Sequence, residues 1–440
     1  MTSSTATPSR PMTMPRAAAL GIGSMVGAGI FALLGEVGAV AGASVWIAFA
    51  IGGVVALLNG YSYSRFGARY PSVGGPVDYL TRGYGEGVFA GGLSIFYYAS
   101  GVIGMAMVAR AFGSYAATLF GLSTSSSLTT GSFAAAIVIG LMVLNASGSA
   151  SVGKAEFVIV GAKLTVLAIF VVGGAFGVSS TLLRGEVTVS SPGSVLAAAG
   201  FAFFAYTGFG VITNAAAEMP DPKRDLPRAL MTAIALVIVL YVAIALVAFG
   251  SLSVSEILKD KDTALAVAAE PIFGRLGFTV MAIAAVLSTA SAINATLYGS
   301  TNISYVLAKR GELPDEFDRR SWRGAPEGLY LTAAMVLVLA TVLDLSQVAS
   351  LGGLAALLVY IAVAAGHLRL TRETGARPWL LWSAILATAG TALAFVVRMA
   401  TDQPFVLVLG LVVIGSAFGG EALLQRRTGR VIRSDASILG

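Results

Sequence analysis

Lys163 is the only charged residue in the middle of a long apolar segment, residues 154–180. If this segment is a helix that begins near Lys154, a rise of about 1.5 Å per residue places the ammonium group about 14 Å along it. That position is close to the centre of a bilayer, whose hydrocarbon core is about 30 Å thick. Burial there disfavours the charged form of an ammonium group, so Lys163 could take up and release a proton. The alternative is a lysine whose head reaches the interface along its apolar stem.

Two glycine-rich stretches could bind a small ligand through their backbone. GIGSMVGAGIF, residues 21–31, places four glycines in one apolar segment, and TGFG, residues 207–210, interrupts another. Glycine is about 1 kcal/mol less favourable than alanine inside a helix, so both stretches predict broken membrane helices. The N-terminal end of a half-helix suits a carboxylate, and freed carbonyl groups suit an ammonium group. The two breaks therefore predict a site for a zwitterionic amino acid. A close-packing face of small residues, Gly23 and Gly27, is the alternative for the first stretch.

Membrane helices must position these groups. Of the 440 residues, 56% are hydrophobic and 11% are charged, whereas soluble domains contain about 25% charged residues. An apolar run of about 20 residues spans a bilayer as a helix, and the sequence predicts about twelve transmembrane helices of this kind. The runs are residues 16–42, 44–66, 86–117, 132–148, 154–180, 193–217, 229–250, 274–308, 328–345, 346–370, 379–401 and 404–424. The predicted fold class is an all-α polytopic membrane protein.

The positive charges indicate the topology. The net charge of +6 would suggest a nucleic-acid partner only if the basic residues formed one surface. Instead, 21 of the 28 lysines and arginines lie in segments on one side of the membrane, as the positive-inside rule requires for cytoplasmic loops. We predict cytoplasmic N- and C-termini, a multi-pass location in the inner (plasma) membrane and no nucleic-acid partner. Residues 1–15 are expected to form a flexible cytoplasmic tail, and residues 425–440 a basic one.

The two predicted breaks lie in the first and the sixth apolar runs. They occupy corresponding places if residues 16–180 and 193–370 are two repeats of five helices each. Because five is odd, the second repeat must enter the membrane inverted. Paired broken helices in inverted repeats indicate a transporter binding site. Residues 379–424 then form the eleventh and twelfth helices.

Several stretches resemble the amino acid–polyamine–organocation (APC) transporter superfamily, which has the LeuT-like fold of five plus five inverted helices. GIGSMVGAGIF resembles the first-span motif, and FAYTGFGVITNAAAEMPDPKRDLPRA resembles the sixth span and its following loop. VGKAEFVIVGAKL resembles the fifth span of archaeal proton-coupled, broad-specificity amino acid transporters, with Lys163 at their lysine position. YSYSRFGARYPSVGGPVDYL and STASAINATLYGSTNISYVLAKRGELP are similar to an inner loop and to the eighth span.

The resemblance implies roles for residues at the two breaks. Backbone N–H groups would bind the substrate carboxylate, and carbonyl groups would bind its amine. The implied carboxylate ligands are Gly27, Ala28 and Gly29. The implied amine ligands are carbonyls near Met25 and of Phe204, Ala205 and Thr207. Phe204 would also be an aromatic gate. Tyr206 would line the pocket for the substrate side chain, unless its hydroxyl only serves a neighbouring helix.

Lys163 would stand where sodium-coupled relatives hold a sodium ion. Its ammonium group would contact the carbonyl of Gly23 and the hydroxyl of Ser288, with Ser291 nearby. The implied coupling ion is therefore a proton, and no sodium, other metal or cofactor is expected. Many relatives have glutamate where this chain has Gly210. Since no carboxylate then lies near the presumed pocket, the predicted substrates are neutral.

The predicted function is proton-coupled uptake of neutral L-amino acids by a secondary active transporter that works by alternating access. Two alternatives keep the fold: an amino acid exchanger, in which Lys163 stays charged, and a sensor that binds amino acids without transporting them. An enzyme is not expected, because no mid-span pair of aspartates is evident. The only histidine, His367, is expected at the solvated membrane interface. The predicted partners are the amino acid and the lipid bilayer, and the oligomeric state is left open.

Overall fold

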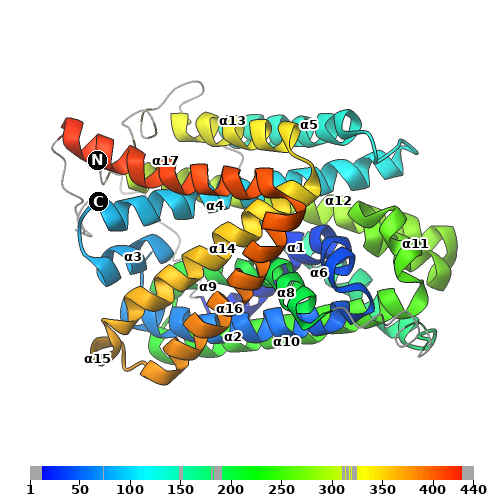
Figure 1. Cartoon of the computed structure of the whole chain (residues 1–440), viewed down its shortest axis with the longest axis horizontal. Helices are drawn as coiled ribbons and strands as arrows, with labels where there is room; N and C mark the ends of the chain where they lie inside the picture. Colours follow the sequence, from blue (N-terminus) through cyan, green and yellow to red (C-terminus); the bar gives the residue numbers. More distant parts are fainter. Residues whose placement is uncertain are drawn as a thin grey trace, which may run out of the picture.

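The computed structural model describes residues 12–72, 74–147, 152–179, 182, 191–309, 313, 317, 319 and 325–428. All regular elements within these ranges are helices (Figure 1). Most of the two predicted tails lies outside the described residues. The predicted all-α polytopic fold is confirmed.

A helix, or a chain of short helices, occupies each predicted apolar run. The first five runs correspond to α1 (Met14–Ala41), α2 (Val45–Arg69), α4 (Val88–Leu119), α5 (Ser127–Ala146) and α6 (Val152–Ala175). The sixth contains α8 (Pro192–Tyr206) and α9 (Val211–Asn214). The others are α10 (Pro222–Ser251), α12 (Ala264–Lys309), α13 (Glu327–Val342), α14 (Leu345–Leu368), α16 (Pro378–Asp402) and α17 (Pro404–Thr428).

Most of these helices are long and apolar enough to cross a membrane. The described residues contain 10 such segments, one of which joins the end of α1 to α2. The helix α13 is apolar but has only 16 residues. The helix α12 changes direction at Gly274, where φ is 67°. That kink lies at the predicted start of the eighth span, residue 274, so the preceding part of α12 belongs to the loop region.

The sixth span leaves the α-helix at the predicted residues, although it does so in a tighter helical turn and not in unwound chain. The helix α8 ends at Tyr206, and a 3-10 turn, η2 (Thr207–Gly210), separates it from α9. A second 3-10 turn, η3 (Ala216–Glu218), follows α9.

The predicted break in the first span is wrong. The helix α1 continues through residues 21–31 without interruption. Its glycines permit close packing instead. A Cβ atom on Gly29 would lie 2.5 Å from the carbonyl oxygen of Ala205, and one on Gly21 would collide with Ile212. A backbone among apolar neighbours keeps its own helical hydrogen bonds, and the missing side chains let α8 and α9 approach.

Corresponding helices of the two predicted repeats pack against each other. The helix α1 packs on α8, α2 on α10, α4 on α12 and α5 on α13. In Figure 1, α5 and α13 lie along one edge, α2 and α10 along the opposite edge, and α1, α6 and α8 between them. This pairing agrees with an inverted repeat, although the repeat boundaries at residues 180 and 193 stay a prediction.

Short helices occupy two of the loops between spans. The helix α3 (Pro76–Tyr84) joins α2 to α4, and α11 (Val254–Lys259) with the 3-10 turn η4 (Lys261–Thr263) joins α10 to α12. A capping box begins α11: the hydroxyl of Ser253 accepts from the backbone N–H of Glu256, whose carboxylate accepts in return. The hydrogen bonds from Ser253 hold the pKa of Glu256 below its usual value. The capping box thus gives this loop a short helix of its own.

Candidate functional site

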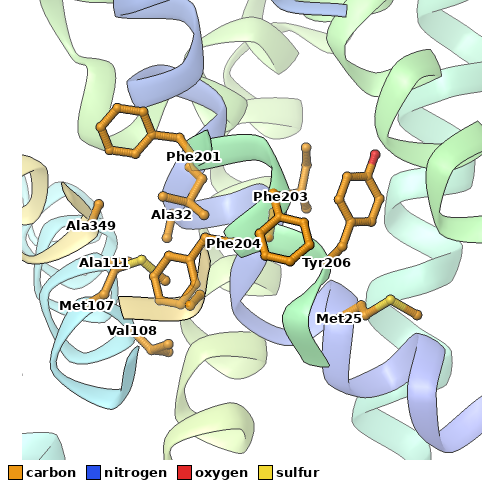
Figure 2. Packing of buried hydrophobic residues seen from close by; sticks show 14 of the residues in the cluster. Met25, Ala32, Met107, Val108, Ala111, Phe201, Phe203, Phe204, Tyr206 and Ala349 are labelled. Atoms are coloured by element: carbon orange, nitrogen blue, oxygen red, sulfur yellow. The ribbon is translucent and has the colours of Figure 1, made fainter. Parts of the chain in front are cut away.

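The predicted substrate residues of α1 and α8 meet where the two helices cross. Besides the contact of Gly29 with Ala205, a Cβ atom on Gly208 would lie 2.8 Å from the backbone nitrogen of Met25. Gly27 and Ala28 belong to the same stretch of α1, and the side chain of Ala28 lies outside the described part. Figure 2 shows Met25, Phe204 and Tyr206 around this crossing. The two glycine-rich stretches therefore pack against each other, and their binding of a substrate stays a prediction.

Side-chain hydroxyl groups donate hydrogen bonds to the carbonyls that were expected to bind the substrate amine. The Tyr241 hydroxyl on α10 donates to the carbonyl of Met25 at 2.7 Å and lies 3.5 Å from that of Ala205. The Thr207 hydroxyl donates to the carbonyl of Phe204 at 2.8 Å. The Tyr360 hydroxyl on α14 donates to the carbonyl of Thr207 at 3.0 Å. Each carbonyl is therefore accessible to a donor side chain, although α1 itself is unbroken.

Tyr206 serves a neighbouring helix through its hydroxyl group. Its hydroxyl donates to the carbonyl of Phe49 on α2 at 3.0 Å, and its ring packs on Tyr241. Figure 2 shows that it points away from Phe204. In this structure Tyr206 joins neighbouring helices, which is the alternative that the sequence left open.

Phe204 occupies a position suited to the predicted aromatic gate. Its ring is 8% exposed and lies beside α14, where a Cβ atom on Gly352 would approach it to 2.5 Å. On α4, a Cβ atom on Gly104 would lie 3.6 Å from the same ring. Two glycines thus make room for the ring between α8, α4 and α14.

Lys163 contacts the carbonyl that the family resemblance implied. Its side chain is 3% exposed, and Nζ donates to the carbonyl of Gly23 at 2.8 Å. A Cβ atom on Gly27 would lie 3.5 Å from Nζ. From α12, Ser288 donates to the carbonyl of Gly27 at 2.8 Å. Ser291 is half-buried one turn further along α12, and its part in coupling stays a prediction.

The side chains that donate hydrogen bonds to the carbonyls at the α1–α8 crossing were only partly predictable from the sequence. Lys163 and Ser288 come from expected positions, whereas Tyr241 and Tyr360 were missed. A buried tyrosine hydroxyl needs a hydrogen-bond partner. Two tyrosines within apolar runs could therefore have indicated exposed carbonyls nearby.

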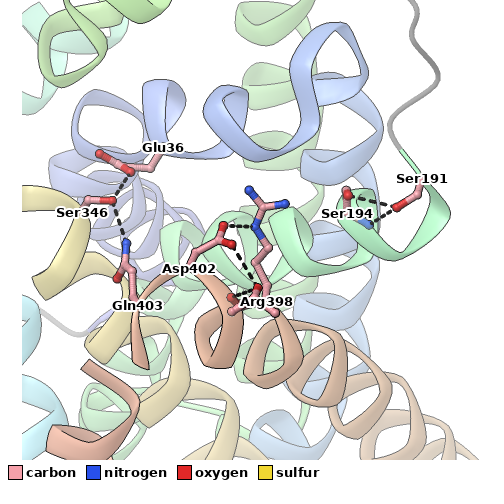
Figure 3. Close-up of polar contacts among 8 residues, drawn as sticks. Glu36, Ser191, Ser194, Ser346, Arg398, Asp402 and Gln403 are labelled. Atoms are coloured by element: carbon pink, nitrogen blue, oxygen red, sulfur yellow. Dashed lines mark hydrogen bonds and ion pairs between the residues drawn. The ribbon is translucent and has the colours of Figure 1, made fainter. Parts of the chain in front are cut away.

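A cluster of polar side chains contacts the C-terminal end of α1. Glu36 is 3% exposed, with Nζ of Lys261 3.1 Å from its Oε1. The hydroxyl of Ser346, at the start of α14, donates to its Oε2 at 2.8 Å. Gln403, between α16 and α17, donates to Ser346 at 3.2 Å (Figure 3). Glu36 thus connects α1 directly to η4 and α14, and through Ser346 to the residue between α16 and α17.

We expect Glu36→Gln to lower the melting temperature clearly, because the substitution removes a buried charge-assisted contact worth about 1.5–3 kcal/mol. Lys261→Met should destabilise at least as much, since it leaves the buried carboxylate without its cation. The measurement is thermal unfolding of the purified protein. Arg398→Gln is the matched control, because the Arg398–Asp402 pair in Figure 3 is exposed and such pairs contribute about 0–1 kcal/mol. Equal melting temperatures for Glu36→Gln and Arg398→Gln would contradict this assignment.

His367 is not at the solvated interface, so that expectation is wrong. Its side chain is fully buried and lies 2.9 Å from the hydroxyls of both Ser62 and Thr374. The ring of Phe66 packs on it with centroids 4.2 Å apart. The helix α2 and the short α15 (Thr371–Thr374) cover the end of α14, which explains the burial.

The fold is that of a polytopic membrane transporter. The chain belongs to the amino acid permease family, which matches residues 12–416. Membership of the APC superfamily, expected from the sequence, is confirmed, and the protein is a transporter rather than an enzyme.

Three relatives illustrate the range of the family. The inner membrane transport protein YbaT of Escherichia coli is 37% identical over 83% of this chain and 84% of its own length. An uncharacterized protein of Methanocaldococcus jannaschii is 35% identical over 87% of this chain and 88% of its own length. The serine/threonine exchanger SteT of Bacillus subtilis is 29% identical over 67% of each chain. The chain is thus a multi-pass membrane protein that transports amino acids.

Proposed function

We propose that the protein imports neutral L-amino acids together with protons. The observation that supports this proposal is the contact of Lys163 with Gly23, because it places an ammonium group directly on the glycine-rich stretch of α1. Loss of a proton from Lys163 would weaken a charge-assisted hydrogen bond to that stretch. The protonation state of Lys163 would then alter the strength of the interaction between α6 and α1, in the stretch of α1 that packs on α8. Positive residues on one side of the membrane support cytoplasmic termini.

The preference for neutral substrates follows from the groups at the crossing. The contacts there involve carbonyls, hydroxyls, aromatic rings and one ammonium group, with no carboxylate among the side chains named. A cationic substrate side chain would be buried without a counter-ion, which is strongly unfavourable. The carbonyls of Met25 and Thr207 would exchange their tyrosine hydroxyls for the substrate ammonium group.

Uptake into proteoliposomes tests the proposal. With radiolabelled L-alanine, an inward pH gradient should drive accumulation, and an inward sodium gradient at constant pH should not. Addition of a protonophore should abolish the accumulation. Stimulation by sodium, or uptake of lysine in preference to alanine, would contradict the proposal.

An exchanger of the same fold is the second candidate, because the related SteT is named a serine/threonine exchanger. In that case Lys163 would stay charged as a fixed structural cation. Counterflow of L-serine at full rate, with no accumulation under a pH gradient, would favour exchange. Binding of amino acids without either activity would indicate a sensor.

A further inference from the structure

The end of the bundle that is expected to face outward contains a polar cavity of about 760 Å³. Its walls come from α4 and the loop after it, from α11 and η4, and from the start of α14. The charged lining residues are Arg110, Lys259, Asp260, Lys261, Asp262, Arg275 and Asp344. A cavity of this size accommodates an amino acid, since ligand pockets range from about 300 to 1,000 Å³.

Arg110 of α4 is a buried cation in the cavity wall, with a side chain 3% exposed. Its Nη1 donates to the carbonyls of Ser127 and Ala340 at 3.2 and 3.3 Å, and its Nη2 donates to the Ser127 hydroxyl at 3.2 Å. Its Nε has no hydrogen-bond partner in the described part of the chain. All its acceptors there are neutral, so no contacting anion balances the charge. An unpaired buried cation is unfavourable, and a guanidinium group matches a carboxylate well.

Asp262 supplies the opposite charge on the same cavity. Its Oδ2 accepts from the hydroxyl of Ser114 on α4 at 3.3 Å. Asp262 is attracted electrostatically to Lys261 first and to Arg110 second, and Arg110 is attracted to both Asp262 and Asp344. Among the described residues, Arg110 nevertheless forms no ion pair with either carboxylate. A zwitterion fits this arrangement, because its carboxylate can approach the guanidinium group while its ammonium group faces Asp262.

We propose that this cavity is an entrance site for the amino acid, in which Arg110 binds the carboxylate and Asp262 faces the ammonium group. It is separate from the α1–α8 crossing: Gly104, beside Phe204, lies six residues before Arg110 on α4, about 9 Å along the helix axis. The role of this cavity as an entrance site in transport rests on the proposed function. Binding of a carboxylate at Arg110 does not depend on that function.

A single reporter thiol tests the site, because the chain contains no cysteine. Val342→Cys places the thiol at an exposed position that lines the cavity. Its alkylation rate is measured on the purified full chain in lipid nanodiscs at constant ionic strength. The probes are sodium acetate, L-alanine, L-alanine methyl ester and methylammonium chloride. Acetate and L-alanine should slow alkylation, and the two probes without a carboxylate should not.

Arg110→Gln in the Val342→Cys protein should raise the concentrations of acetate and L-alanine needed for protection by about tenfold or more. The matched control is Arg275→Gln, which removes an exposed arginine of the same cavity and should leave protection unchanged. Equal protection with and without Arg110, or protection by the methyl ester, would overturn the proposal. If Arg110→Gln does not fold, the Val342→Cys protein with its native Arg110 still tests the proposal, because absence of protection by acetate rejects the site. Failure of the proposed transport gives a different result, in which acetate still protects but no amino acid accumulates.

Discussion

Replacement of Lys163 by alanine is expected to reduce accumulation driven by a pH gradient by at least about tenfold, equivalent to about 1.4 kcal/mol. The substitution removes the hydrogen bond from Nζ to the carbonyl of Gly23. Such charge-assisted bonds contribute about 1.5–3 kcal/mol. It also removes the ammonium group that is proposed to exchange a proton. Uptake of radiolabelled L-alanine into proteoliposomes, with and without the pH gradient, measures the effect.

Two further variants separate coupling from folding. Lys163→Met keeps much of the side-chain volume beside Gly27 but has no proton to exchange, so it should fold, allow counterflow and fail to accumulate substrate. Lys223→Ala removes an exposed lysine at the start of α10 and should behave as the native protein does. Native accumulation by Lys163→Met would show that the lysine does not couple transport to protons.

Gly29→Val is expected to abolish transport and to lower the yield of folded protein. Its Cβ atom would lie 2.5 Å from the carbonyl oxygen and 2.8 Å from the Cα atom of Ala205. These are backbone atoms, so no side-chain rotation relieves the collision, and overpacking typically costs about 1–3 kcal/mol. The helices α1 and α8 would have to separate where the substrate is proposed to bind. Melting temperature and L-alanine uptake are the measurements.

Gly140→Ala is the matched control for this substitution. Gly140 lies within α5, and a Cβ atom there would meet nothing within 4 Å. Alanine should therefore be neutral or stabilise the helix by up to about 1 kcal/mol. A Gly29→Val protein as stable and active as the Gly140→Ala protein would mean that α1 and α8 pack less closely than described.

Hydropathy was sufficient to predict the helices, because a bilayer requires long apolar segments with satisfied backbones. Glycine content was not sufficient to predict which helix breaks. Glycine lets α1 pack against Ala205, and it also lets the 3-10 turn of the sixth span pack against Met25 at Gly208. The outcome depends on what faces each glycine, which only the folded chain specifies.

In the candidate site, too, the sequence predicts some side-chain contacts but not others. The contact between Lys163 and Gly23 was predictable only from the resemblance to APC transporters, because the depth of a lysine in a bilayer indicates that it needs a polar partner but not which one. Tyr206 and Tyr241 both lie in apolar runs, and their spacing does not indicate which carbonyl each hydroxyl meets. His367 was misplaced because neighbouring arginines indicated an interface, while the burial by α2 and α15 depends on tertiary packing.

The short helix α13 has a consequence for the surrounding lipid. Its 16 residues extend about 24 Å at 1.5 Å per residue, less than the roughly 30 Å thickness of a hydrocarbon core. Acyl chains beside α13 must shorten or tilt to match it, at a modest cost for each ångström of mismatch. The annulus around the transporter is therefore uneven, and thinner bilayers should suit this edge of the molecule best.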